Sequence, residues 1–289
     1  MIVRNIAWSV WALLPIAGLA YHFGPGQRAY TEDRAAGLLK EASRLDAEAE
    51  AAQETAFQSQ LASLKARRLS LETKTPESVA AANAAAASED AAYAKAAAAW
   101  NATADKLHEA QEMLESAGSD KAQGVRIARD RALIRSGSIG PGVDDLEAML
   151  DALADAGKES TPIADQARDE AATGYYYGAR LLRAAGKPAS DWREVSGLAR
   201  QDFRYLAETG DPSKPDSKAS ERQKNLELVL NLEQSSPEDL LAKPLPKYSP
   251  RKGAEGLRPG NRPGKTKRPP RRKDDARGAG GVGDIEGGW

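Results

Sequence analysis

Residues 75–100 read TPESVAAANAAAASEDAAYAKAAAAW, and this alanine-rich stretch decides the fold class. Thr75 and Pro76 form a helix start, because a threonine side chain can cap the first turn and proline suits the first helical position. Of the 40 residues from Ser78 to Ala117, 18 are alanine, the residue with the highest helix propensity. We therefore predict a long helix that ends near Ala117 and an all-α protein around it.

A second long helix is predicted upstream, beginning at Thr31 with Glu32 and Asp33 in its first turn, where acidic side chains complement the helix dipole. Its expected buried row is spaced by four and three residues and then shifts by one residue, which is typical of a stutter rather than of a regular coiled coil. The row consists of Leu38, Ala42, Leu45, Ala49, Ala52 and Ala56, followed after the shift by Phe57, Leu61, Leu64 and Leu71.

We expect these two helices to form an antiparallel, coiled-coil-like hairpin over residues 28–117. Tyr93, Trp100 and Leu107 recur every seven residues and mark its predicted packing face. The alternative is a single extended stalk or a partly frayed spacer, because alanine side chains bury little apolar area.

The N-terminal segment, residues 1–27, is predicted to be a membrane anchor. From Ile6 to Phe23 it reads IAWSVWALLPIAGLAYHF, which contains no charged residue. As a helix it would span roughly 27 Å, just enough for a hydrocarbon core of about 30 Å. The alternative is a signal peptide, with cleavage near Ala20 and a secreted or periplasmic product. Either interpretation predicts that the bulk of the chain is extracytoplasmic.

Residues 118–242 are predicted to form a module of helix pairs. One pair covers about 120–136 and 143–156, with Gly137 ending its first helix and Gly142 allowing the helices to cross closely. A second pair starts at Thr161 and Pro162, and its first helix ends at Gly186. The segments ALIRSG and RLLRAAG, which end at Gly137 and Gly186, indicate an internal duplication. Closing helices are expected over 218–234 and 236–241.

The spacing from Gly137 to Gly142, Leu146 and Met149 resembles the second half of a tetratricopeptide repeat. The period here is nearer 50 residues than the usual value of about 34. The resemblance implies stacked α-α pairs whose first helices line a concave surface that binds a peptide or protein. The candidate partner-binding residues on that surface are Tyr176, Tyr177, Arg180 and Arg183. Packing in the core is the other interpretation of the cluster Tyr175, Tyr176 and Tyr177.

The C-terminal segment, residues 243–289, is predicted to be a disordered tail. It contains 7 prolines and 10 glycines, and its 13 basic and 5 acidic residues give a net charge of +8. A flexible solvated tail, attachment to an anionic surface or acidic protein, and nucleic-acid binding all remain open, the last disfavoured because aromatic residues for base stacking are few. The candidate polyanion-binding residues are Lys265, Lys267, Arg268, Arg271, Arg272 and Lys273.

The sequence offers no constellation for catalysis, and we expect no enzyme activity, cofactor, metal site or small-molecule substrate. It has no cysteine and only two histidines, His22 and His108. The predicted function is that of a membrane-anchored helical scaffold or adaptor, with protein partners in a membrane-associated complex. The alternative is a structural envelope spacer, or a secreted helical protein, whose basic tail binds an anionic surface.

Overall fold

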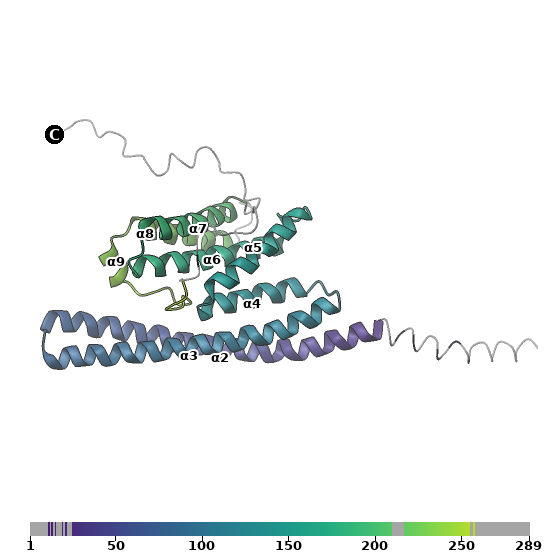
Figure 1. Cartoon of the computed structure of the whole chain (residues 1–289), viewed down its shortest axis with the longest axis horizontal. Helices are drawn as coiled ribbons and strands as arrows, with labels where there is room; N and C mark the ends of the chain where they lie inside the picture. Colours follow the sequence, from purple (N-terminus) through teal and green to yellow (C-terminus); the bar gives the residue numbers. More distant parts are fainter. Residues whose placement is uncertain are drawn as a thin grey trace, which may run out of the picture.

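The computed structural model describes residues 25–209 and 217–254, together with positions 11, 13, 15, 19, 21 and 257. This part of the chain is helical, as predicted, and folds as a long two-helix hairpin with a bundle of shorter helices lying along one side of it (Figure 1). The helices are α2 Pro25–Thr73, α3 Pro76–Ser116, α4 Ala122–Ser136, α5 Ile139–Asp155, α6 Pro162–Ala184, α7 Ala189–Thr209, α8 Ser217–Gln234 and α9 Pro237–Ala242.

Helices α2 and α3 form the predicted antiparallel hairpin, joined by a two-residue turn at Lys74 and Thr75. The Thr75 hydroxyl accepts a hydrogen bond from the Ser78 N–H at 3.2 Å, and Pro76 occupies the first helical turn, so the predicted start of α3 is confirmed. On the α3 side, Tyr93, Trp100 and Leu107 all face the interface, as their spacing predicted.

The interface side of α2 repeats every seven residues and consists of small side chains: Ala35, Ala42, Ala49, Ala56 and Ser63 are all at most 2% exposed. The predicted shift of the buried row is wrong, because Leu61 and Leu71 are exposed while the heptad row continues through Ser63. Small side chains let the two helix backbones approach closely, and this close packing favours Ala and Ser over the larger leucines.

Helices α4 to α8 form the module, in which each helix packs against the next along the chain. Gly137 ends α4 with a left-handed φ of 103°, as predicted. Helix α5 begins at Ile139, four residues earlier than expected, so the predicted loop before Val143 is its first turn. A Cβ carbon on Gly142 would lie 2.9 Å from the Asp130 carbonyl oxygen, which confirms a close crossing at that glycine.

The core of the module is one cluster shared by α4 to α9. Phe203 and Leu206 from α7 are at most 2% exposed and pack with Leu146 from α5 and Tyr175 from α6. Val229 and Leu232 from α8 complete the cluster from the far side, so α8 acts as the predicted closing helix. A separate set of contacts joins α4 to α3 and thereby fixes the module to the hairpin.

The ordered body continues beyond the boundary predicted at residue 242. Residues 243–254, which we call the strap, leave α9 and run between the module and the hairpin (Figure 1). Ser249 is fully buried and Ala254 is 6% exposed. The strap is ordered because side chains of the hairpin pair with its backbone, an interaction that composition does not reveal. The remainder of the predicted tail, apart from Leu257, lies outside the described residues.

The membrane-spanning helix predicted for residues 6–23 needs correction. Within the described residues, none of the helices combines the length and the apolar character that crossing a bilayer requires. Helix α2, which follows that segment, carries charged side chains along its length, and these are costly in hydrocarbon. Most of residues 6–23, including the cleavage site near Ala20, lies outside the described residues. The predicted single-pass membrane localisation is corrected with it.

Candidate functional site

Three of the four predicted partner-binding residues lie in the interior of the molecule. Tyr176, Tyr177 and Arg180, all on α6, are between 6% and 8% exposed. Burial raises the pKa of both phenols above the ordinary tyrosine value. The Arg180 guanidinium donates to the carbonyl oxygen of Pro244 at 2.6 Å, at the point where the strap begins. These side chains therefore hold the molecule together rather than line an open surface.

The fourth residue, Arg183, closes the far end of the module. Its guanidinium donates hydrogen bonds to the carbonyl oxygens of Leu232 and Ser235, near the end of α8. The same group lies 4.3 Å from the ring centroid of Trp192, a favourable cation–π geometry. Arg183 thus satisfies carbonyls that the end of α8 leaves without intrahelical partners.

The strap lies in a channel whose walls come from α2, α3 and α4, and two glutamines of α2 bind its backbone. The Gln53 side-chain amide donates to the carbonyl oxygens of Lys247 at 2.7 Å and Ser249 at 3.3 Å. The side-chain oxygen of Gln60 accepts a hydrogen bond from the Leu245 N–H at 3.0 Å. Because Gln53 and Gln60 are seven residues apart, they project from the same face of the helix.

An arginine of α4 joins the hairpin to the strap. The Arg135 guanidinium lies 4.7 Å from the ring centroid of Trp100 and 4.3 Å from that of Tyr248. Trp100 is fully buried, and its indole N–H donates to the Gln53 oxygen at 3.2 Å. Tyr248 packs against both the hairpin and the core of the module. Helix, hairpin and strap are therefore fixed at one point.

Acidic side chains of the hairpin hold the basic residues of the strap. Arg251 contacts the carboxylate of Glu89 and that of Asp90, the latter with its Nε at 2.7 Å. Lys247 pairs with Glu54 at 2.6 Å. Glu89 is 2% exposed, so its ion pair is shielded from water, whereas the Lys247 pair is open to solvent and contributes little.

A cavity of about 130 Å³ lies where the strap crosses the end of α4. Its lining includes the side chains of Tyr93, Arg135 and Arg251. Burial raises the pKa of Tyr93 to about 12, so this phenol stays protonated at neutral pH. The cavity is large enough for several water molecules.

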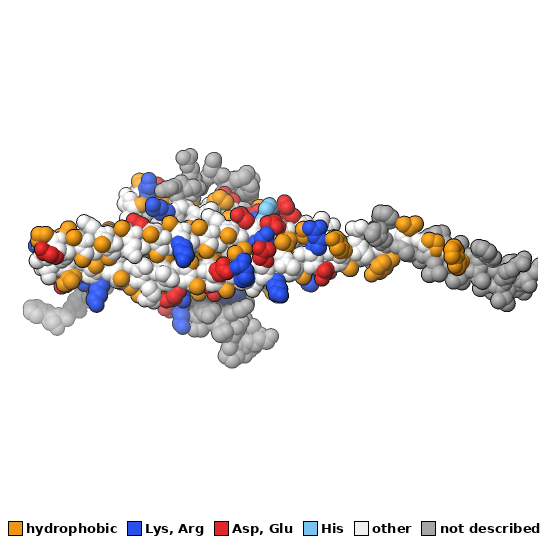
Figure 2. Space-filling view, turned by 90° about the horizontal axis from the view of Figure 1, so that it is seen from below, with side chains coloured by type: hydrophobic (Ala, Val, Ile, Leu, Met, Phe, Trp, Pro, Cys, Tyr) orange, Lys and Arg blue, Asp and Glu red, His pale blue; other side chains and the backbone are white. Residues whose placement is uncertain are grey.

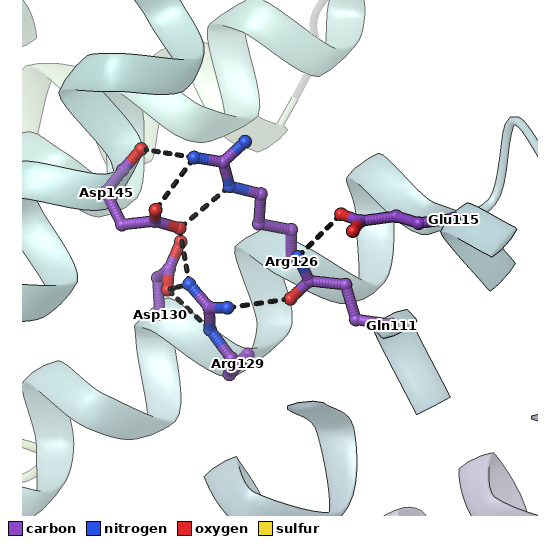
Figure 3. A network of polar contacts seen from close by, with 6 residues as sticks. All are labelled: Gln111, Glu115, Arg126, Arg129, Asp130 and Asp145. Carbon is purple, nitrogen blue, oxygen red and sulfur yellow. Dashed lines mark hydrogen bonds and ion pairs between the residues drawn. The ribbon is translucent and has the colours of Figure 1, made fainter. Parts of the chain in front are cut away.

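A polar network connects α3, α4 and α5 at the other end of α4 (Figure 3). Arg126 binds the carboxylate of Asp145 through two hydrogen bonds of 2.7 Å. Arg129 donates to Asp145, to Asp130 and, at 2.9 Å, to the Gln111 oxygen. The network therefore joins the hairpin, through α3, to the second helix of the module.

Asp130 is the most buried member of this network, with no exposed surface. Burial and the adjacent Asp145 carboxylate raise the pKa of Asp130 to about 8, although Arg129 opposes the shift. Within the described residues, its Oδ2 atom has no hydrogen-bond donor. Burial also disfavours ionised Asp145, but hydrogen bonds from Arg126 and Asp130 outweigh it and hold that pKa below its usual range. A protonated Asp130 beside an ionised Asp145 fits this arrangement.

The tip of the hairpin is different from the channel, because it exposes large apolar side chains. We define the tip as residues 61–88, between the strap contacts at Gln60 and Glu89. It projects beyond the module (Figure 1). Figure 2 shows scattered hydrophobic side chains, with basic and acidic ones between them, along the whole hairpin face that is turned away from the module. The large apolar side chains exposed at the tip are Leu61, Leu69, Leu71 and Val79, at 37%, 52%, 68% and 46%.

Several predicted features cannot be located. Lys265, Lys267, Arg268, Arg271, Arg272 and Lys273 lie outside the described residues, as does His22. His108 lies on the surface of α3, 3.4 Å from Glu112. Among the described residues, no group of three or more histidine or acidic side chains is placed to hold a metal ion.

No protein-family model matches this chain, and no curated protein or solved structure matches it either. The resemblance to tetratricopeptide repeats therefore stays a prediction.

Sequence reasoning missed Gln53, Arg135 and Tyr248, the residues that bind the strap. One signal was present: Gln53 and Gln60 interrupt the otherwise small and apolar buried face of α2. A glutamine buried in a helix interface requires hydrogen-bond partners. The sequence does not reveal that these partners lie almost 200 residues away along the chain.

Proposed function

We propose that this protein is a non-catalytic helical scaffold that binds a partner protein through the tip of its hairpin. The observation that carries the proposal is the group of exposed apolar side chains at Leu61, Leu69, Leu71 and Val79. Beyond the tip, Tyr93, Trp100, Leu107 and Leu114 of α3 are buried, although Tyr30 near the start of α2 is 61% exposed. Exposed large apolar side chains that gather at one end of a helical body are typical of an interaction site.

The charge at the tip indicates the chemistry of the partner. Lys65, Arg67, Arg68 and Lys74 are exposed around the apolar side chains, and only Glu72 and Glu77 oppose them nearby. Complementary charge favours encounter with an acidic surface and disfavours a second copy of this basic tip. We therefore infer a partner that presents an amphipathic helix. Its apolar face would pack against the apolar side chains of the tip, and acidic residues beside that face would contact the basic side chains.

Site-specific photo-crosslinking tests this proposal. A photoreactive side chain replaces Leu69 at the tip, and the matched control places it at Leu228, an α8 leucine that is 44% exposed. We expect Leu69 to give a discrete adduct in the native cell, mapped by mass spectrometry to an acidic helix of the partner. Replacing Leu61 and Leu71 by glutamine should abolish that adduct. Equal adducts at both positions, or an adduct that survives the glutamine substitutions, would overturn the proposal.

A further inference from the structure

The strap is bound in the way that a protein binds an extended peptide ligand. Its backbone groups are recognised by side chains of other elements: Gln53 and Gln60 of α2 hold its middle and Arg180 of α6 holds its start. Backbone hydrogen bonds give affinity in such complexes, and side-chain pockets give specificity. The channel supplies both.

Gln53 is arranged in advance for a carbonyl ligand. Its side chain is 1% exposed, and its oxygen accepts the Trp100 indole N–H. That hydrogen bond orients the amide so that its nitrogen donates to two strap carbonyls. With the strap in place, this donor is buried and satisfied by the two carbonyl oxygens. An amide oriented in this way favours an extended backbone at this position.

The side-chain contacts define which extended segment fits. Tyr248 stacks on Arg135, and Arg251 enters the notch between Glu89 and Asp90. The backbone of the strap then passes so close to α4 that a Cβ carbon on Gly253 would lie 1.7 Å from the Gly137 oxygen. The segment that satisfies these contacts reads Lys-Tyr-Ser-Pro-Arg-Lys-Gly over residues 247–253.

We propose that the channel between α2, α3 and α4 is a peptide-binding site, filled in cis by the strap and open in trans to the same segment of a second copy. The cis strap is tethered and therefore acts at a high effective concentration. A segment from another copy binds only when the cis strap has left the channel. The site is separate from the hairpin tip and does not depend on the function proposed for it.

The test uses the full-length chain with a released strap. Tyr248→Ala and Gly253→Val together remove the ring contact and introduce a backbone clash. A fluorescent synthetic peptide of wild-type sequence 243–254 is then titrated, with binding followed by anisotropy. We expect the released variant to bind the peptide at least tenfold more tightly than the wild-type chain does. Equal affinities for the two proteins would overturn the proposal.

A third variant locates the bound peptide. Adding Gln53→Ala to the released variant should weaken peptide binding at least tenfold, because the amide that recognises the backbone is lost. The matched control is Gln27→Ala, which removes an exposed glutamine near the start of the same helix and should leave peptide affinity unchanged. Peptide affinity that is unchanged by Gln53→Ala would place the peptide outside the channel and overturn the proposal.

A further measurement needs no substitution. Amide hydrogen exchange of residues 243–254 is followed in the wild-type chain, with and without excess peptide carrying heavy isotopes so that the two segments differ in mass. Displacement in trans predicts faster exchange in the chain's own strap when the peptide is present. Unchanged exchange at saturating peptide would contradict the proposed competition, whether or not the variants fold.

Discussion

Gly253 and Gly137 touch through their backbones, with no room for a side chain between them. Both have φ in the positive range, 112° and 103°, which glycine adopts without strain. This contact fixes the end of the strap to the end of α4.

Gly253→Ala should therefore detach the strap, because its Cβ carbon would overlap the Gly137 oxygen. We expect faster amide exchange over 243–254 and a lower melting temperature. The control is Gly186→Ala. Gly186 has a φ of 68° but open space around it, so the substitution should lower the free energy of unfolding by only about 1 kcal/mol through backbone strain. Equal effects of the two substitutions would show that the close approach is unimportant.

Gly174→Ala should destabilise the module by about 1–3 kcal/mol through overpacking. The added carbon would lie 2.5 Å from Cγ2 of Val143 and 3.0 Å from Cδ1 of Ile134. Gly197→Ala on α7 meets nothing within 4 Å and should stabilise by up to about 1 kcal/mol through helix propensity. Urea denaturation measures both changes, and opposite signs are the expected result.

Asp130→Asn should remove a pH dependence of stability. Because the folded-state pKa of about 8 lies above the ordinary value of 3.8, the folded state holds an extra proton between these limits. The contribution of Asp130 to the free energy of unfolding is therefore fully present below about pH 4 and is lost as the pH rises through 8. The free energy of unfolding falls over this range by up to about 1.4 kcal/mol per pH unit.

Urea midpoints between pH 6 and pH 8 test this relation. We expect them to fall in the wild-type chain and to fall much less in Asp130→Asn. The exposed Asp105→Asn variant should keep the wild-type slope. A slope that is the same in all three proteins would exclude Asp130 as its source.

Arg135→Gln should cost roughly 1–3 kcal/mol of stability, because it removes a guanidinium held between two rings in a largely buried position. Arg34→Gln is the control: Arg34 lies 5.9 Å from the Tyr30 ring on the surface and should contribute less than about 1 kcal/mol. Guanidinium unfolding followed by tryptophan fluorescence compares the two. Similar losses would indicate that enclosure between the rings adds nothing.

The sequence predicted the elements of this fold well and their contacts less well. The helix start at Thr75, the helix end at Gly137 and the close crossing at Gly142 were all visible, because each depends on local backbone chemistry. The continuous heptad row of α2 was missed, since the larger leucines at Leu61 and Leu71 suggested another face. Leucine has a high helix propensity whether its face of the helix is buried or exposed. Which face of α2 is buried therefore depends on its packing against α3.

The candidate site depended on long-range contacts that no local pattern contains. The resemblance made Tyr176, Tyr177 and Arg180 candidates for a binding surface, with core packing as the other interpretation of the tyrosines, and the structure buries all three. The strap itself was predicted to be disordered on composition. Composition indicates only how much apolar surface a segment can bury. The strap is instead held by hydrogen-bond donors and acceptors of the hairpin, which its own composition does not reveal.

Gln53 and Ser249 are 196 residues apart along the chain, so the ribosome makes the glutamine long before the serine that it binds. The hairpin leaves the ribosome with its glutamine donor in place long before the strap exists. The hairpin and most of the module can fold in that interval, since their contacts join neighbouring helices. The strap can only be added last, so a chain that lacks its final residues would carry an open channel from the moment of its release.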